Sequence, residues 1–506
     1  MKHIKHIFIG ILIPLFAFSQ ALGEDSASGY LKSHVVTKKL SNGITLVMLN
    51  RGFAPTLYLE IAFKVASADE SYRTMGAAHL LEHMLFKGTD TVGTKDFKQE
   101  EPILRRIEAV GETIDALKLK NPRNENIPKL EEELRALQEE HQKFVVSAPY
   151  DTLYTEHGAV GFNASTSKDM TNYYISLPAS ELELWAKTEA ERLRKPIMRE
   201  YYQERSNVVQ ERMMRTDSIG TGLLYEAFLA QAFFAHPYRH PVIGWGTNIP
   251  YLSVKDVRSF YYSNYVPSRM TITIVGRQNT DETFSIVEKY FSYIEPVPEP
   301  PEINVSEPMQ RGERRVEINF ASNPALLIGW HKPTYPAKED FVFDVFAEVA
   351  AGGRSSALYK SLVIEKKKAY SISAWNGMPG ARYDNMFVIS ATPANGVSHQ
   401  ELEADIYAEL ATAADSVSSK DLETVKMRME ASSLEGLTTN SGIGRMLSYS
   451  QTVFGDWRYV MNYVSAIADV TAADIKQAFH TYCVDTNRVV GFLKDSRVNG
   501  QKDGDK

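Results

Sequence analysis

Hydrophobic and polar residues follow distinct periods along the first ninety residues of the chain. Residues 38–49 (KKLSNGITLVML) predict a β-hairpin, because Asn42-Gly43 favours a tight turn and alternating apolar residues follow it. Residues 56–65 (TLYLEIAFKV) predict a second strand. Residues 76–86 (GAAHLLEHMLF) have no internal Gly or Pro and are rich in Ala, Leu, Glu and Met, which predicts a helix.

Residues 97–147 have a different pattern. Two charged, amphipathic stretches are separated by NPRNEN at 121–126, which predicts an inserted helical hairpin. Either this hairpin is a solvated structural arm or it is a lid that controls access of substrate.

The rest of the chain divides into two halves. Strands are predicted at 161–178 and 268–276, and helices at 182–193 and 199–215. The proline-rich, acidic residues 296–308 predict a linker between a domain at 30–295 and a domain at 309–498.

The two halves also resemble each other. DVRSFYYSNYVPSRMTITIVG, from Asp256, and DIKQAFHTYCVDTNRVVGFLK, from Asp474, both read as an amphipathic helix, a short loop and a buried strand, with Val266 and Val484 at matching places. This similarity indicates a duplicated unit. Helices and strands do not alternate regularly, so the predicted fold class is α+β.

The first residues have the layout of a secretory signal. Lys2 and Lys5 precede an apolar run too short to span a bilayer comfortably, and small residues follow at Ala21 and Gly23. Residues 1–23 are therefore predicted to be a cleaved signal peptide; an uncleaved anchor is the alternative. A cleaved signal places the protein in the periplasm or outside the cell, with no membrane span afterwards.

Composition narrows the choice of function. The chain has 506 residues and a formal net charge of −7, and it lacks a long basic run, so nucleic acid is not an expected partner. Cys483 is the only cysteine, so an internal disulfide is excluded, and we interpret it as a small buried hydrophobic residue.

The predicted helix at 76–86 carries unusual chemistry. Each helical residue turns by about 100°, so His79 and His83 lie about 40° apart, and Glu82 lies about 60° to the other side of His79. Two imidazoles one turn apart hold a metal ion such as zinc, and a neighbouring carboxylate can take a proton from its water. H-x-x-E-H is the inverted form of a zinc protease motif.

A third ligand is needed, because catalytic zinc usually has three protein ligands. The stretch ERSNVVQERMMRTDS offers Glu204 and Glu211, about two helical turns apart on one face. Spacing alone leaves both candidates open.

Four motifs occur in one order: HLLEH, NASTSKDMTNYY, ERSNVVQE and AHPYRHPVIG. In this combination the chain resembles the M16 family of zinc peptidases, which includes pitrilysin, insulysin and the mitochondrial processing peptidases. The resemblance implies two homologous domains, each a sheet covered by helices, that form a clamshell-like half chamber, with the second domain non-catalytic.

The resemblance also implies roles for residues. His79, His83 and Glu211 would bind one Zn²⁺ per chain, Glu82 would be the general base, and Glu204 would support the site without touching the metal. An edge strand containing Asn163, Ala164, Ser165 and Thr166 would pair with an extended peptide substrate. The implied activity is a metalloendopeptidase that hydrolyses peptides or unfolded polypeptides in the cell envelope.

One position departs from the family pattern. Active single-chain relatives have an Arg seven positions before a Tyr in the second domain, and the pair contacts substrate. This chain has Tyr370 but Val363 at the Arg position. We therefore expect a dimer, and favour a heterodimer in which a homologous subunit supplies the Arg/Tyr pair.

Other interpretations remain. The chain could be a non-catalytic subunit, a peptide-binding module with weak turnover, or a metal hydrolase for a non-peptide substrate. His236 and His240 have i, i+4 spacing, but Pro237 and Pro241 disfavour a helix there, so we expect an ordered loop.

Overall fold

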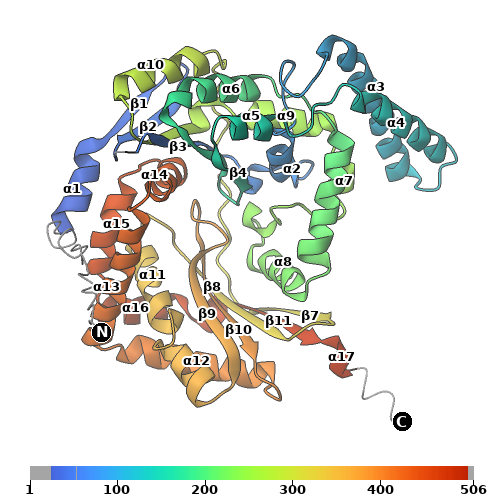
Figure 1. Cartoon of the computed structure of the whole chain (residues 1–506). Helices are drawn as coiled ribbons and strands as arrows, with labels where there is room; N and C mark the ends of the chain where they lie inside the picture. Colours follow the sequence, from blue (N-terminus) through green and yellow to red (C-terminus); the bar gives the residue numbers. More distant parts are fainter. Residues whose placement is uncertain (1–23, 53, 500–506) are drawn as a thin grey trace, which may run out of the picture.

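The computed structural model describes residues 24–52 and 54–499 and contains two sheets (Figure 1). The predicted signal peptide at 1–23 lies outside these residues. The first sheet has the order β1-β2-β6-β3-β5-β4. Its strands are β1 (Val35–Lys39), β2 (Thr45–Asn50), β3 (Thr56–Phe63), β4 (Val160–Thr166), β5 (Thr171–Pro178) and β6 (Met270–Gly276).

The second sheet repeats this arrangement without an equivalent of β1. Its order is β7-β11-β8-β10-β9. Its strands are β7 (Arg314–Phe320), β8 (Ala325–Lys332), β9 (Ala369–Met378), β10 (Asn385–Pro393) and β11 (Arg488–Asp495). β2 and β6 pair in parallel, as do β7 and β11, and the strand pairs beyond them are antiparallel. The predicted α+β class with two homologous units is confirmed.

Seventeen α-helices surround the sheets in the described residues. The first ten are α1 (Glu24–His34), α2 (Ala77–Met84), α3 (Phe97–Lys120), α4 (Ile127–Gln142), α5 (Pro149–Glu156), α6 (Leu182–Arg194), α7 (Tyr201–Arg212), α8 (Gly220–Ala232), α9 (Val254–Asn264) and α10 (Thr280–Phe291). The others are α11 (Lys338–Ala351), α12 (His399–Ser416), α13 (Ser419–Gly436), α14 (Asn440–Phe454), α15 (Tyr459–Ala468), α16 (Ala472–Tyr482) and α17 (Ser496–Asn499). No helix in this part of the chain has the length and apolar character needed to cross a bilayer.

Local sequence signals account for many of these boundaries. The turn between β1 and β2 contains Asn42 and Gly43, and Gly43 has φ 100°, which glycine adopts readily. α3 and α4 form the expected hairpin, and residues 121–126 are the loop that connects them. The helix expected at 199–215 is shorter: α7 ends at Arg212 and a π-helical turn, Met213–Asp217, follows. Residues 295–313, which include the predicted linker, contain neither helix nor strand.

Each half supplies a helix that covers the sheet of the other half. α8 packs against β7 and β11, where Leu224 and Phe228 join a buried cluster with Leu327 and Val388 of the second sheet. α14 packs against β3 and β6 of the first sheet. Because these helices bury apolar surface that the sheets would otherwise expose, the halves depend on each other for stability.

A buried polar cluster also joins the halves. Asp69, after β3, accepts hydrogen bonds from Arg269 (3.3 Å) and from Arg382 (2.9 Å), and Arg382 belongs to the β9–β10 connection. Asp169, between β4 and β5, accepts from the main-chain N–H groups of Ala381 and Arg382. These contacts fix the loops of the first sheet against the second half.

Candidate metal centre

The N-terminus of α2 is held by a buried carboxylate. Glu70 accepts hydrogen bonds from the N–H groups of Gly76 and Ala78, each at 2.8 Å. Gly76 has φ 94°, and a Cβ there would lie 2.8 Å from the carbonyl oxygen of Ile243, so a side chain does not fit. The start of α2 is therefore fixed, and the predicted ligands His79 and His83 follow within its next two turns.

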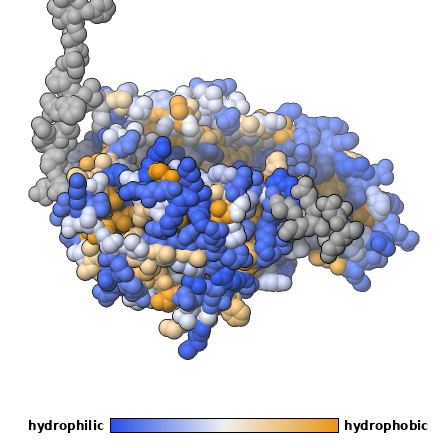
Figure 2. All heavy atoms as spheres, turned by 90° about the horizontal axis from the view of Figure 1, so that it is seen from below, coloured by the Kyte–Doolittle hydropathy of each residue, from blue (hydrophilic) through white to orange (hydrophobic). Residues whose placement is uncertain are grey.

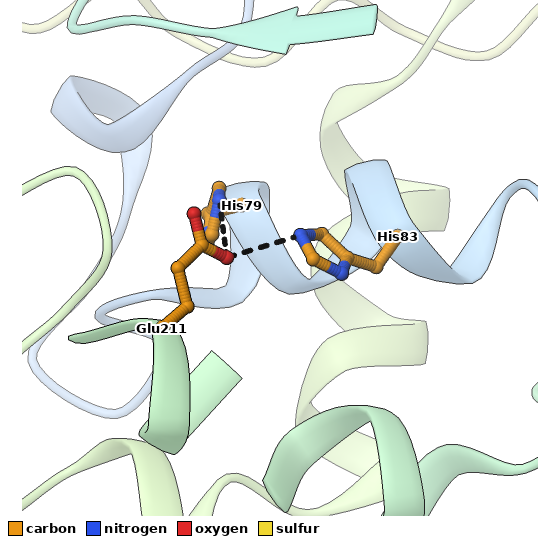
Figure 3. A group of neighbouring side chains, drawn as sticks. All are labelled: His79, His83 and Glu211. Carbon is orange, nitrogen blue, oxygen red and sulfur yellow. Dashed lines mark ion pairs between the residues drawn. The ribbon is translucent and has the colours of Figure 1, made fainter. Parts of the chain in front are cut away.

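Three side chains from two helices converge. The Nε2 atoms of His79 and His83 lie 3.7 and 3.5 Å from the same carboxylate oxygen, Oε2 of Glu211. Figure 3 shows both rings of α2 turned toward the carboxylate at the end of α7. In the described part of the chain, these three residues form the one group of His, Cys, Asp or Glu side chains found close enough to share a metal ion.

The donor set fits zinc. Ligand atoms about 2.0–2.2 Å from a tetrahedral Zn²⁺ lie about 3.3–3.5 Å from each other. The two N···O distances of 3.5 and 3.7 Å are close to that separation. Two imidazole nitrogens and one carboxylate oxygen are also the donors that catalytic zinc sites use, with a fourth position left for water.

Electrostatics distinguish the two histidines. Burial, together with the nearby charges of His83 and Arg215, lowers the pKa of His79 to about 3, so this imidazole is neutral and ready to bind a metal. Burial acts against the charge of His83 too, but Glu204, Glu211 and other carboxylates outweigh it and raise the pKa of His83. A raised pKa favours the protonated ring, with which a metal ion at His83 would compete.

Glu204 lies behind His83. Its Oε2 is 3.4 Å from His83 Nδ1, and its Oε1 is 2.6 Å from Lys87 Nζ. Burial would raise the pKa of Glu204, but these two partners outweigh burial and lower it to about 2. Glu204 is thus an anion that orients the His83 ring, and Glu211 is the residue that faces both imidazoles.

Glu82 is oriented by the strand beside it. The Thr166 hydroxyl donates a hydrogen bond of 2.6 Å to Glu82 Oε2. Burial raises the pKa of Glu82, and the Thr166 hydrogen bond and the positive charge of His83 oppose that rise only in part. A carboxyl group with a raised pKa is suited to taking up and releasing a proton.

The predicted edge strand is at the edge of the first sheet. β4 is the last strand in the order, and Asn163 to Thr166 pair with β5 on one side. Ser165 Oγ donates to Asn172 Oδ1 at 2.6 Å, so its side chain is engaged within the sheet. A cavity of about 550 Å³ adjoins this strand, lined among others by Thr166, His79 and Glu211.

The other sequence candidates lie elsewhere. Tyr370 is 58% exposed on β9, and its hydroxyl accepts from the Asn395 N–H at 3.4 Å; it does not line the cavity beside His79. Val363 packs against the apolar core of the second half. His236 is buried at the N-cap of a short 3-10 turn, Pro237–Arg239, where its Nδ1 accepts from the Tyr238 N–H, and it does not belong to the candidate metal group.

Sequence reasoning missed several residues around the site. Arg215 pairs with Oε1 of Glu211 at 2.8 Å, and Lys87 bridges Glu204 and Glu200. A weak signal was present in the spacing of four between His83 and Lys87 and between Glu200 and Glu204, although Lys87 follows the end of α2 and Glu200 precedes the start of α7.

Comparisons with known proteins point to one peptidase family. A family model described as insulinase (peptidase family M16) matches residues 46–121, and a model described as the peptidase M16 inactive domain matches 251–429. Together they cover about half of the chain.

Relatives extend the similarity over most of the length. The zinc protease PqqE of Helicobacter pylori is 24% identical over 476 residues, covering 92% of this chain and 94% of the relative. A probable mitochondrial-processing peptidase subunit beta of Schizosaccharomyces pombe is 25% identical, over 51% of this chain and 45% of its own.

Solved structures share the fold. A protease from Helicobacter pylori has a TM-score of 0.76 at 22% identity, covering 91% of this chain and 99% of its own. The periplasmic protease PqqL from Escherichia coli has a TM-score of 0.67 at 15% identity, covering 93% and 48%. From the two family models and the full-length relatives, we conclude that this chain belongs to the M16 family of peptidases.

Proposed function

We propose that the protein is a zinc-dependent endopeptidase that hydrolyses peptides or unfolded polypeptides. The observation that carries the proposal is the convergence of two imidazole Nε2 atoms on one Glu211 oxygen, with Glu82 beside them. A zinc ion held by His79, His83 and Glu211 would supply Lewis acidity that activates water and polarises a carbonyl group. The named zinc proteases among the relatives support this reading.

Glu82 is the proposed general base. The Thr166 hydroxyl fixes its Oε2, which leaves Oε1 to accept a proton from the attacking water. The same carboxyl group then passes this proton to the nitrogen of the leaving amine. The raised pKa of Glu82 makes its carboxylate a stronger base, which favours the first of these transfers.

The open edge of β4 is the proposed binding site for the peptide backbone. A substrate segment would add as a strand beside Asn163, Ala164, Ser165 and Thr166, so that main-chain hydrogen bonds provide affinity with little demand on sequence. Thr166 then has two roles, since its main chain borders the substrate and its hydroxyl holds Glu82. This strand is the reason for preferring a peptide over a non-peptide substrate.

A partner chain and an exported location complete the proposal. Tyr370 is exposed and Val363 packs against an apolar core, so Val363 itself does not take the place of the expected Arg. A homologous subunit carrying the Arg/Tyr pair would then be needed for full activity. The signal-like residues 1–23, together with the likeness to a periplasmic protease, favour the periplasm or the cell exterior.

Glu82→Gln tests the function. The variant keeps the size of the side chain but cannot take the proton, so kcat for peptide digestion should fall by at least about a hundredfold while zinc content stays at one per chain. Glu139→Gln, on the exposed face of α4, is the matched control and should be unaffected. A Glu82→Gln protein that digests peptides as fast as wild type would refute the proposal. Assays with and without any protein that copurifies separate the single-chain from the two-chain enzyme.

A further inference from the structure

The inserted hairpin of α3 and α4 is attached to the helix that carries Glu204 and Glu211. Asp115 of α3 pairs with Arg205 of α7 through two hydrogen bonds, of 2.6 and 2.9 Å. The Tyr202 ring of α7 lies against Gly111, where a Cβ would be 2.0 Å from the ring. Figure 1 shows the hairpin beside α7, and Figure 2 shows a mainly hydrophilic surface on the lobe where α3 and α4 lie. The hairpin is therefore docked by one side and solvated on another.

The base of the hairpin holds a buried arginine. Glu100 of α3 accepts from Arg199 Nε at 2.5 Å, and His141 of α4 contacts the same Glu100 oxygen at 2.8 Å. Arg199 in turn donates to the carbonyl oxygens of Lys87 (2.5 Å) and Thr89 (2.9 Å). The loop that follows α2 thus surrounds the Arg199 guanidinium group, and Glu100 of the hairpin holds that group in place.

Glycines make this wrapping feasible. Gly88 has φ 94° and Gly93 has φ 87°. A Cβ at Gly88 would lie 2.2 Å from the Val92 carbonyl oxygen, and one at Gly93 would lie 2.9 Å from the Lys87 carbonyl oxygen. The loop can close around Arg199 because these two positions have no side chain.

A second line of contacts runs from the hairpin to a proposed zinc ligand. Gln142, at the end of α4, donates to Glu200 Oε1 at 2.6 Å. Lys87 Nζ bridges Glu200 Oε2 at 2.9 Å and Glu204 Oε1 at 2.6 Å. Glu204 Oε2 then faces His83 Nδ1 at 3.4 Å. The carboxylates of Glu200 and Glu204 each contact one neighbour through each oxygen, so the contacts run without a gap from Gln142 to His83.

The backbone of Glu200 is strained. It has φ 59° and ψ 25°, the left-handed region, which costs a non-glycine residue about 1–2 kcal/mol. Glycine would adopt this conformation freely. A glutamate at a position that favours glycine is explained by its carboxylate, which joins Gln142 to Lys87.

We propose that the base of the inserted hairpin is a positioning device for the zinc ligand His83. Gln142, Glu200 and Lys87 are positioning residues that hold the Glu204 carboxylate against Nδ1, which keeps the proton on that nitrogen and directs Nε2 at the metal. His79 lacks such support, since its buried Nδ1 has no hydrogen-bond partner in the described residues. The proposal rests on the proposed function, because it requires zinc at this site.

Glu200→Gly is the decisive variant. It removes the carboxylate but relieves the backbone strain, so the melting temperature should stay the same or rise. The zinc dissociation constant, measured by competition with a chelator, should rise about tenfold, the lower end of effects seen for groups that orient metal ligands. The visible spectrum of the cobalt-substituted protein should also change, because the His83 ring is free to turn.

Three further variants complete the test. Lys87→Gln should weaken zinc binding by a similar factor. In Glu200→Gln the new amide oxygen can accept from Lys87, and its NH2 group can donate to the Gln142 oxygen once the Gln142 amide turns over, so affinity should stay within about threefold of wild type. Lys129→Gln, on the exposed face of α4, is the control and should leave affinity and spectrum unchanged.

The outcomes separate the two proposals. If wild type binds no zinc, the proposed function and this inference both fail. If wild type binds zinc but Glu200→Gly and Lys87→Gln bind it equally tightly, with an unchanged cobalt spectrum, only the positioning role is overturned.

Discussion

Because α8 of the first half packs against the second sheet, we predict that a residue of α8 stabilises that sheet. Phe228 of α8 is fully buried against that sheet. A Cβ at Gly329 of β8 would lie 2.9 Å from its ring, and one at Gly491 of β11 would lie 3.2 Å from it. Phe228→Ala is the perturbation, because it removes the ring without adding any polar group.

The magnitude follows from the size of the buried ring and from how far its neighbours can move into the space it leaves. Replacing a buried Phe with Ala costs about 3–5 kcal/mol, and the cost is larger where the surroundings do not collapse. The ring lies against two glycines within paired strands, which have no side chains to move into the cavity. Met386 and Leu224 also lie beside the ring and can relax in part, so we expect a loss of about 3–5 kcal/mol in the free energy of unfolding.

Hydrogen exchange read by mass spectrometry is the assay, with urea unfolding beside it. A loss of about 4 kcal/mol corresponds to about a thousandfold faster exchange wherever opening requires global unfolding. The amides of β8 and β11 should show this acceleration although Phe228 belongs to the other half. Phe234→Ala is the matched control, because Phe234 is 70% exposed, and it should change stability by no more than about 0.5 kcal/mol.

A different result would refute the reasoning. If exchange quickened in α8 alone while β8 and β11 kept their wild-type rates, α8 would not stabilise the second sheet. A change of less than about 1 kcal/mol in the urea experiment would lead to the same conclusion.

Three further predictions concern charge and metal. Asp69→Asn removes the carboxylate that Arg269 and Arg382 share. Glu302 still pairs with Arg382 at 2.8 Å, so the urea midpoint should fall by the equivalent of about 3 kcal/mol, and an unchanged midpoint would contradict the role of this cluster. Although burial would raise the pKa of Glu100, hydrogen bonds from His141 and Arg199 hold it at about 2, below the unfolded value of about 4.3. The stability that ionised Glu100 contributes is complete above about pH 4.3 and is lost as pH falls toward 2. In Glu100→Gln the free energy of unfolding should therefore decrease less over this pH range than in wild type. Identical pH dependences for the two proteins would argue against the pairing. Zinc at a hundred times its dissociation constant should stabilise the protein by about 2.7 kcal/mol, and a chelator should remove this gain; His83→Ala should respond to neither, and a variant that still responded would point to another binding site.

Much of the fold is predictable from local sequence. Asn42-Gly43 specifies the first hairpin, and the break at 121–126 separates α3 from α4, because turn residues and helix breakers act through their own backbone. The matching segments from Asp256 and Asp474 indicate the duplication that the two sheets display. The exchange of α8 and α14 has no comparable signal, because an apolar helix face does not specify which sheet it covers.

The same limit applies to the candidate metal site. Spacing on one helix brings His79, Glu82 and His83 to one face, so the sequence by itself determined this part of the site. It left Glu204 and Glu211 equivalent, since two turns of helix bring both to one side. Only the packing of α7 against α2 decided that Glu211 faces both Nε2 atoms and that Glu204 lies behind His83. The hairpin contacts through Lys87 and Glu200 depend on the same packing, because residues more than a hundred positions apart meet only when the chain has folded.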